Sequence, residues 1–209
     1  AMTGTKKEVL RDLLIKLRVC SEESLRDLTA LSKTDQVITK SFKGNREDLF
    51  KFLPKNGVCA EIGVDSGGNA INNIFPITDP KQLYLIDPWE KCSKSVEMWH
   101  ASADAQKNNR LHVAEAFKDN ENVTLVQDFS IEAAAQFEDK YFDWIHFDAS
   151  VDYVDQRRDL LHWLPKMKKG GYITGGMFCL EDHHWAGTHG AILEFILKEV
   201  MGKPEYVAE

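Results

Sequence analysis

The chain has 209 residues, 43% of them hydrophobic, which is enough to bury one substantial core. Its formal net charge of −7 is uneven, because residues 1–57 carry 12 Lys and Arg against 8 Asp and Glu, whereas residues 58–209 carry 14 against 25. An acidic body of this kind repels phosphate backbones, so we do not expect a nucleic-acid partner.

Cysteine spacing and hydropathy exclude several further classes. The four cysteines are widely separated and lack the paired spacing of zinc sites. No apolar run approaches the roughly 20 residues of a membrane span, and no secretory segment is recognisable. We therefore expect a cytoplasmic protein without a membrane partner.

The N-terminal region has a helical pattern. Val9, Leu10, Leu13, Leu14 and Leu17 share one stripe, and later leucines continue it. This predicts a helical cap over residues 1–43 that packs on the main body or on a second subunit, giving a homo-oligomer, or that closes over a substrate. A further helix is expected over residues 46–53, capped by Asn45 and ended by Pro54.

From Val58 onward, short apolar strands alternate with amphipathic helices. Strands are expected at 58–64, 82–87, 123–127, 143–148 and 171–175, and helices at 69–75, 93–118, 130–138, 153–167 and 189–200. Strands that are apolar throughout are buried on both faces. Residues 44–209 therefore read as one α/β domain, a Rossmann-like, doubly wound and mainly parallel sheet with helices on both faces. Residues 205–208 could form one short strand after the last helix, and a seventh strand is expected to be missing, trimmed from the chain or supplied by a partner subunit.

Two strand ends suggest a nucleoside site. The first strand ends in Glu61, Gly63 and Gly67, and Asp87 closes the next strand 24 residues after Gly63. Glycine lets the backbone approach a ligand, and an acid about 20 residues further on suits ribose hydroxyls. No Arg or Lys occurs between Val58 and Asp79, so a ligand with hydroxyls and positive charge fits better than one with phosphates.

An ordered set of short segments between residues 44 and 200 resembles the class I S-adenosylmethionine-dependent methyltransferases, in particular the small-molecule branch similar to methyltransferase family 24. The segments are Gly44-Asn45-Arg46, Glu61-Ile62-Gly63-Val64, Tyr84 to Trp89, Val123-Thr124-Leu125, Asp128-Phe129-Ser130, Phe142-Asp143-Trp144, Asp148 to Tyr153, Asp159-Leu160, Trp163-Leu164-Pro165 and Lys169-Gly170-Gly171. Each segment is weak alone, and their order makes the resemblance specific.

The resemblance implies a cofactor site for S-adenosylmethionine, with S-adenosylhomocysteine as product. Glu61 and the turn from Gly63 through Val64 to Gly67 would hold the methionine portion, and Asp87 the ribose. Asp128 and Phe129 would bracket the adenine, with Trp89 and Asp148 as further contacts. Each residue also has a structural alternative: a tight turn for the glycines, a helix cap for Asp128 and core packing for Trp89.

The chain departs from this family where relatives hold a metal or a base. Val151 replaces a histidine, and Gly175-Gly176-Met177-Phe178 replaces a segment that carries histidine or paired acids. Asp148 remains as the one acid of that set, so a bound divalent metal is not expected, although magnesium sites with few carboxylates exist.

A replacement catalytic group lies directly downstream. His183 and His184 stand beside two acids, and either imidazole could take a proton from an acceptor hydroxyl, oriented by Asp148 or Asp152. Tyr153 retains its family position and either positions the acceptor or packs on its helix. An exposed polar loop that caps a helix remains an equal alternative for the histidines.

The expected function is O- or N-methylation of a small metabolite. Two rivals stay open: a catalytically degenerate protein that binds the cofactor or a partner, and a nicotinamide-dependent dehydrogenase. The dehydrogenase is weaker, because the turn lacks the Gly-x-Gly-x-x-Gly spacing and puts Asp65 where a pyrophosphate would lie.

Overall fold

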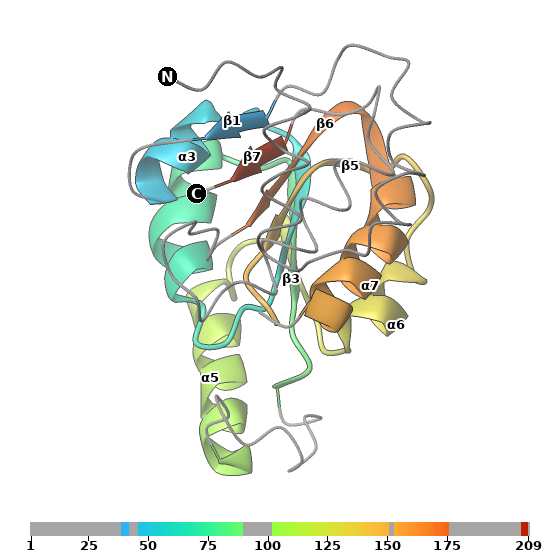
Figure 1. Cartoon of the computed structure of the whole chain (residues 1–209). Helices are drawn as coiled ribbons and strands as arrows, with labels where there is room; N and C mark the ends of the chain where they lie inside the picture. Colours follow the sequence, from blue (N-terminus) through green and yellow to red (C-terminus); the bar gives the residue numbers. More distant parts are fainter. Residues whose placement is uncertain (1–38, 42–45, 90–101, 151–152, 176–205, 209) are drawn as a thin grey trace, which may run out of the picture.

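The computed structural model in Figure 1 describes residues 39–41, 46–89, 102–150, 153–175 and 206–208. The predicted helix at 189–200 and nearly all of the predicted cap lie outside these residues. Among the described helices, none combines the length and apolarity that crossing a membrane requires.

A seven-stranded sheet forms the centre of the molecule, in the order β1-β7-β6-β5-β2-β3-β4, and all its described pairings are parallel. The strands are β1 (Thr39–Ser41), β2 (Val58–Ile62), β3 (Gln82–Ile86), β4 (Val123–Val126), β5 (Phe142–Phe147), β6 (Met167–Gly175) and β7 (Tyr206–Ala208). The chain runs outward from β2 to β4, then returns and runs outward on the other side from β5. The order therefore reverses between β2 and β5, the position where parallel sheets of this kind bind ligands.

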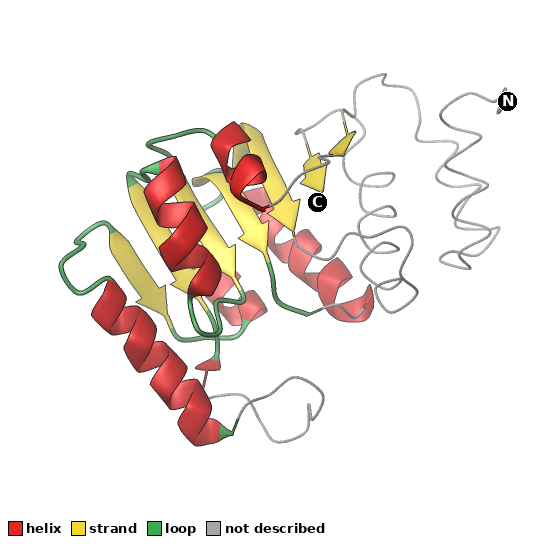
Figure 2. Ribbon diagram, turned by 90° about the vertical axis from the view of Figure 1, so that its left-hand side faces the viewer, coloured by secondary structure: helices red, strands yellow, loops and turns green. Residues whose placement is uncertain are grey.

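Helices cover both faces of the sheet, as Figure 2 shows. One face carries α3 (Arg46–Phe52), the π-helical turn η1 (Ala70–Ile74), α4 (Phe75–Thr78) and α5 (Ala103–Ala116). Their apolar residues pack with Cys59 and Trp144 of the central strands. The other face carries α6 (Ser130–Ala134) and α7 (Tyr153–Trp163), followed by the short 3₁₀ turn η3 (Leu164–Lys166), which pack on Ala60 and Ile145. The predicted doubly wound architecture is confirmed.

The five predicted central strands all form, with ends shifted by one or two residues except in β6. That strand starts at Met167, whose Cα pairs with Phe142 across an irregular register. The polar run Lys168-Lys169-Gly170 hid this extension, because it lacks the apolar pattern of a buried strand. The sequence therefore predicts the start of this strand at position 171, where apolar residues resume after Pro165 and Gly170.

The edge of the sheet differs from the expectation. β7 forms where one short strand was predicted, and β1 pairs in parallel beside it. The sequence predicts residues 39–41 as part of the helical cap, whereas the structure places them in β1, an N-terminal strand that brings the sheet to seven strands. The segment Thr39-Lys40-Ser41 is polar, so hydrophobic periodicity gave no sign of a strand held by backbone pairing.

Candidate functional site

The turn after β2 lies where the strand order reverses, and its glycines are required by close packing. Gly63 has φ +89°, and a Cβ there would lie 2.4 Å from the carbonyl oxygen of Asp148. Gly67 has φ +79°, and its Cβ would lie 2.6 Å from Val113 of α5. Both positions favour glycine for its freedom at positive φ and its lack of a side chain. A Cβ on Gly68, in contrast, would meet open space.

The Asp87 carboxylate binds this turn directly. Its Oδ2 accepts hydrogen bonds of 2.9 Å from the backbone N–H groups of Val64 and Asp65, and its Oδ1 accepts one of 2.7 Å from Trp89. Burial raises the pKa of Asp87, while these three N–H donors oppose that shift. The predicted convergence of the glycine turn and Asp87 is therefore a direct contact. About one of the four lone-pair positions of the carboxylate is left for a hydroxyl.

Asp65, at the tip of the turn, forms hydrogen bonds with Asp87, Trp89 and Asn109. It adopts φ +47°, which is unusual for a residue other than glycine. The indole N–H of Trp89 donates to its carbonyl oxygen at 2.8 Å, and Asn109 of α5 donates to its Oδ1, also at 2.8 Å. Trp89 is completely buried. Its ring thus lies in the core and supports the turn from behind, as the packing alternative for this residue requires.

Below the turn, Glu61 of β2 is 1% exposed. Asn69 donates to its Oε1 at 2.7 Å, whereas its Oε2 has no hydrogen-bond partner among the described residues. Burial, reinforced by the charge of Asp148, raises the pKa of Glu61 to about 8, against the opposing effects of Asn69 and Arg46. At neutral pH this carboxyl group is therefore mostly protonated, and it retains an unused oxygen.

His146 lies beside Glu61 on the neighbouring strand, because the Cα register pairs the two residues across β2 and β5. The ring is fully buried, and its Nδ1 lies 2.8 Å from the hydroxyl of Thr174 on β6. Its Nε2 has no partner within the described residues. Burial lowers the pKa of His146 to about 3, so the imidazole is neutral at physiological pH.

Sequence reasoning missed His146, although a signal was present. It is the one basic side chain in the run Phe142–Phe147, and it precedes Asp148 by two residues, so both face the same side of the sheet. Only the pairing register reveals that Glu61 belongs to the same group, and a single sequence does not give that register.

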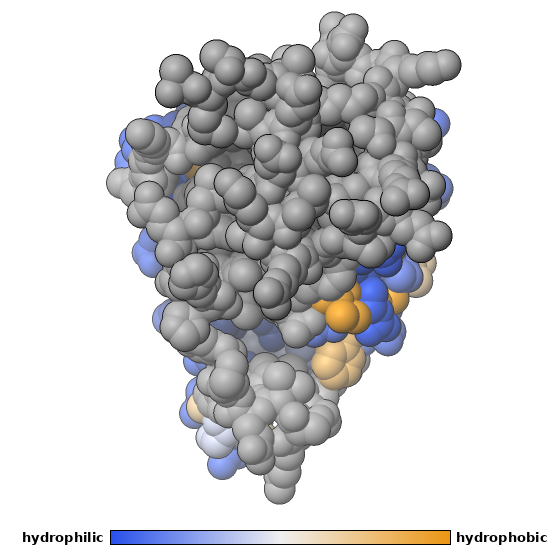
Figure 3. Space-filling view, viewed as in Figure 1, coloured by the Kyte–Doolittle hydropathy of each residue, from blue (hydrophilic) through white to orange (hydrophobic). Residues whose placement is uncertain are grey.

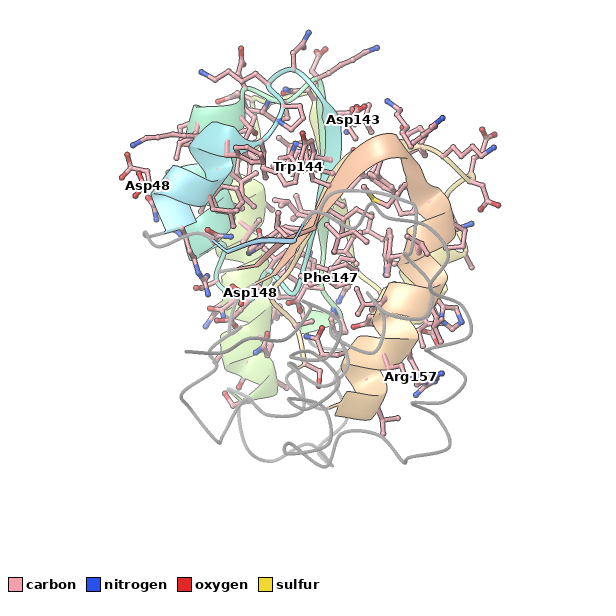
Figure 4. All side chains as sticks on the ribbon, turned by 45° about the horizontal axis from the view of Figure 1, so that its top comes forward. Asp48, Asp143, Trp144, Phe147, Asp148 and Arg157 are labelled. Carbon is pink, nitrogen blue, oxygen red and sulfur yellow. The ribbon has the colours of Figure 1, made fainter. Side chains whose placement is uncertain are left out.

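Asp148 follows β5 and carries an ion pair with Arg46, the first residue of α3. The two nitrogen–oxygen distances are 2.7 and 3.3 Å, and the side chain of Asp148 is 16% exposed. Figure 4 shows Asp148 and Asp143 at opposite ends of β5. Glu61, His146 and Asp148 each offer one ligand atom, and these atoms lie within 4.8 Å of one another. We call these three residues the acceptor cluster.

Asp128 and Phe129 lie between β4 and α6. The Asp128 carboxylate accepts hydrogen bonds from the Phe129 backbone at 3.2 Å and from Gln136 at 3.0 Å. Phe129 is the N-terminal cap residue of α6, without a side-chain hydrogen bond, and is 43% exposed. Figure 3 shows an apolar patch near the lower ends of α6 and α7. Phe129 directly precedes α6, and Val154, the second residue of α7, is also an exposed apolar residue. The exposed ring is compatible with the predicted stacking on a base.

Most of the predicted catalytic group lies outside the described residues. This applies to Asp152, His183 and His184. Tyr153 is the first residue of α7, and only its backbone is described. Within the part of the chain that the structure describes, Asp148 is the predicted catalytic residue whose side chain lies at the strand ends.

Among curated protein sequences, no significant relative was found. Among solved structures, a candidate rRNA methylase from Clostridium thermocellum has a TM-score of 0.52 at 14% identity, over 77% of this chain and 83% of the other. A candidate methyltransferase from Bacillus halodurans has a TM-score of 0.42 at 16% identity, over 60% of this chain and 46% of the other. At such low identity the first likeness concerns the fold alone, and the second is too weak to support an argument.

A family model described as a methyltransferase domain matches residues 60–175, which is more than half of the chain. The matched segment begins beside Glu61 and ends with β6, so it contains the glycine turn, Asp87 and the acceptor cluster. The sheet order and the contact between the turn and Asp87 agree with that match. The chain belongs to the class I S-adenosylmethionine-dependent methyltransferases.

Proposed function

We propose that this methyltransferase acts on an oxygen or nitrogen atom of a small metabolite, without the divalent metal used by related enzymes. The observation that carries the proposal is the site where the strand order reverses. There a buried carboxylate holds the glycine turn, and two polar atoms below it have no hydrogen-bond partner among the described residues. The net charge of −7 disfavours a polyanionic acceptor.

The described residues fit the cofactor by their chemistry. Glu61 and His146 offer unpartnered acceptors for the methionine portion, and Gly68 faces open space. Asp87 has room for one ribose hydroxyl, and the exposed ring of Phe129 offers a face for the adenine. Trp89 takes no direct part in this proposal, since its ring is in the core.

The sulfonium of the cofactor supplies an electrophilic methyl group, and transfer is an in-line displacement in which positive charge disappears. The protein therefore has to align the acceptor and exclude water rather than stabilise a new charge. The turn held by Asp87 and Trp89 fixes the position of the cofactor in that alignment. Tyr153, at the start of α7, is proposed to position the methyl acceptor.

A hydroxyl acceptor also needs a base, whereas a neutral amine does not. On sequence grounds we assign that role to His183 or His184, with Asp148 or Asp152 orienting the ring. Asp148 is already paired with Arg46, and a guanidinium at this place opposes a nearby dication. This ion pair is the structural support for transfer without the metal.

Calorimetry with S-adenosylmethionine and S-adenosylhomocysteine tests the cofactor part. We expect both to bind with one site per chain, and absence of heat with both would reject the proposal. Methyl transfer to a panel of phenols, sugars, amines and total RNA, followed by mass spectrometry, tests the acceptor. Activity on RNA alone would reject the small-metabolite assignment.

The metal part is tested in the same assay. We expect turnover to persist within twofold after exhaustive treatment with EDTA and to gain nothing from added magnesium. Loss of activity that magnesium restores would contradict it. Tight cofactor binding without transfer to any acceptor would instead favour the catalytically degenerate alternative.

A further inference from the structure

Helix α5 contacts the glycine turn at two points. Val113 lies against Gly67, where an added Cβ would come within 2.6 Å of its side chain. Asn109 donates a hydrogen bond of 2.8 Å to Asp65 Oδ1, and the amide of Gln106 lies 3.4 Å from the same oxygen, which is a weaker contact. The helix therefore contacts both the tip of the turn and its far end.

The residues that make these contacts share one face of α5. Positions 106, 109 and 113 follow the spacing i, i+3 and i+7 of a single helical stripe. The first half of the stripe carries two amides and lies past the carboxyl ends of the strands, as Figure 2 shows. The second half carries Val113, which packs in the core with Phe50 and Cys59. The polar half of the stripe thus faces a carboxylate, and the apolar half faces the core.

Apolar burial holds α5 over part of its length only. Of its 14 residues, Gln106 and Val113 are buried, and Leu111 is 48% exposed. A buried amide is unfavourable without a hydrogen-bond partner, and the Asp65 carboxylate provides an acceptor for Gln106. The docking of the first half of α5 therefore depends on polar contacts with the turn, so the positions of the helix and the turn are linked.

The backbone of Asp65 makes this link relevant to the cofactor site. Asp65 has φ +47°, a conformation that aspartate adopts only at some cost in free energy. In this conformation its N–H donates to Asp87 Oδ2 at 2.9 Å. Hydrogen bonds from α5 to the Asp65 side chain favour the conformation that directs this N–H at Asp87. The amides of α5 therefore act on the Asp87 carboxylate through Asp65.

We propose that Asn109 and Gln106 are positioning residues that fix the Asp65 end of the glycine turn, so that the docking of α5 sets the affinity for the cofactor. The inference rests on the proposed function, in which this turn and Asp87 hold S-adenosylmethionine. It gives α5 a role in cofactor binding through side chains that donate to the turn and not to the ligand.

Asn109→Ala removes the shorter of the two amide contacts, and calorimetry with S-adenosylhomocysteine on the full chain measures the effect. We expect binding to become about three- to tenfold weaker. Asn108→Ala is the matched control, because Asn108 is an exposed residue of the same helix and the substitution changes helix propensity equally. The control should keep wild-type affinity. Wild-type affinity in Asn109→Ala would overturn the proposal.

A double-mutant cycle shows whether the effect passes through Asp65. Glycine adopts positive φ readily, so Asp65→Gly removes the carboxylate without straining the backbone. We expect Asp65→Gly to weaken binding by at least the same factor as Asn109→Ala. In the Asp65→Gly background, Asn109→Ala should then add less than about a twofold loss. Independent losses that multiply in the double variant would overturn the coupling.

Exchange of the two interacting groups provides a rescue. Asn109→Asp alone places two carboxylates against each other and should bind more weakly than Asn109→Ala. Combined with Asp65→Asn, it lets the amide at position 65 donate to the carboxylate at position 109, and asparagine also tolerates positive φ. We expect the combined variant to regain affinity to within about twofold of wild type. A combined variant that binds no better than Asn109→Asp would contradict the proposal.

Urea denaturation of the same variants separates a positioning role from a purely structural one. A loss of stability in Asn109→Ala without a loss of affinity would show a purely structural contact and overturn the inference, while the proposed function would stand. If the wild type bound neither S-adenosylmethionine nor S-adenosylhomocysteine, the proposed function would fail and this inference with it.

Discussion

Two buried carboxylates on neighbouring strands, Asp87 and Glu61, have different surroundings. Burial raises the pKa of both. Asp87 receives three backbone hydrogen bonds from the turn and from Trp89, whereas Glu61 receives one from Asn69 and keeps an oxygen without a partner among the described residues. Asp87 therefore has a structural role in holding the turn, whereas Glu61 keeps an oxygen that is available to bind a ligand.

The largest effect is expected from removing the Asp87 carboxylate, which holds the glycine turn. Asp87→Ala leaves three backbone N–H groups without an acceptor, two in the turn and one at Trp89, so we expect a loss of about 3–5 kcal/mol in the free energy of unfolding together with loss of cofactor binding. Urea denaturation and calorimetry measure the two effects. A stability within about 1 kcal/mol of wild type would show that Asp87 does not hold the turn.

Trp89→Phe gives a smaller effect of the same kind. It removes the indole donor to Asp65 while keeping most of the buried ring, and we expect a loss of about 1–2 kcal/mol with at least tenfold weaker cofactor binding. Trp163→Phe is the matched control, because it removes a similar indole bond to Ser130 on the opposite face. The control should lose similar stability and retain affinity; equal losses of affinity would contradict a specific role for Trp89.

Glu61→Gln tests the protonation of the Glu61 carboxyl group through the pH dependence of the free energy of unfolding. In the folded protein Glu61 keeps its proton to about pH 8, whereas in the unfolded chain it loses it near its ordinary value of 4.5. The folded state thus binds more protons between these values, and Glu61 lowers stability as pH rises, by up to about 1.4 kcal/mol per unit.

The useful window for that measurement is pH 6.5–8. Below it, Asp159, whose pKa burial raises to about 6, acts in the same direction, and His146, with a lowered pKa, acts in the opposite one. We expect the stability of Glu61→Gln to be flatter with pH than that of wild type in this window. Parallel curves from chemical denaturation would contradict a protonated Glu61.

The smallest effect on stability is expected at the adenine side. Phe129→Ala truncates a ring that is 43% exposed, so stability should stay within about 0.5 kcal/mol. If the ring stacks on the base, affinity for S-adenosylhomocysteine should fall about three- to tenfold. Val154→Ala, at another exposed apolar residue, should change neither quantity, and an unchanged affinity in Phe129→Ala would remove this residue from the site.

The sequence predicted the parallel sheet and placed the glycine turn and Asp87 at the ends of neighbouring strands, because apolar runs and glycine spacing are local patterns. It missed β1, a polar strand defined by pairing alone, and His146, whose meaning depends on cross-strand register with Glu61. It left Trp89 open between a cofactor contact and core packing, and the structure shows its ring buried in the core. The sequence thus predicted features that depend on local patterns, but it did not predict contacts between residues far apart in the chain.

A crystal structure of the S-adenosylhomocysteine complex tests the central claim most directly. The account predicts that the ligand lies at the ends of β2 and β5, with its methionine portion beside Glu61 and His146 and with the Asp87 bonds to the turn intact. A ligand bound elsewhere, or with its methionine portion turned away from these two residues, would contradict it.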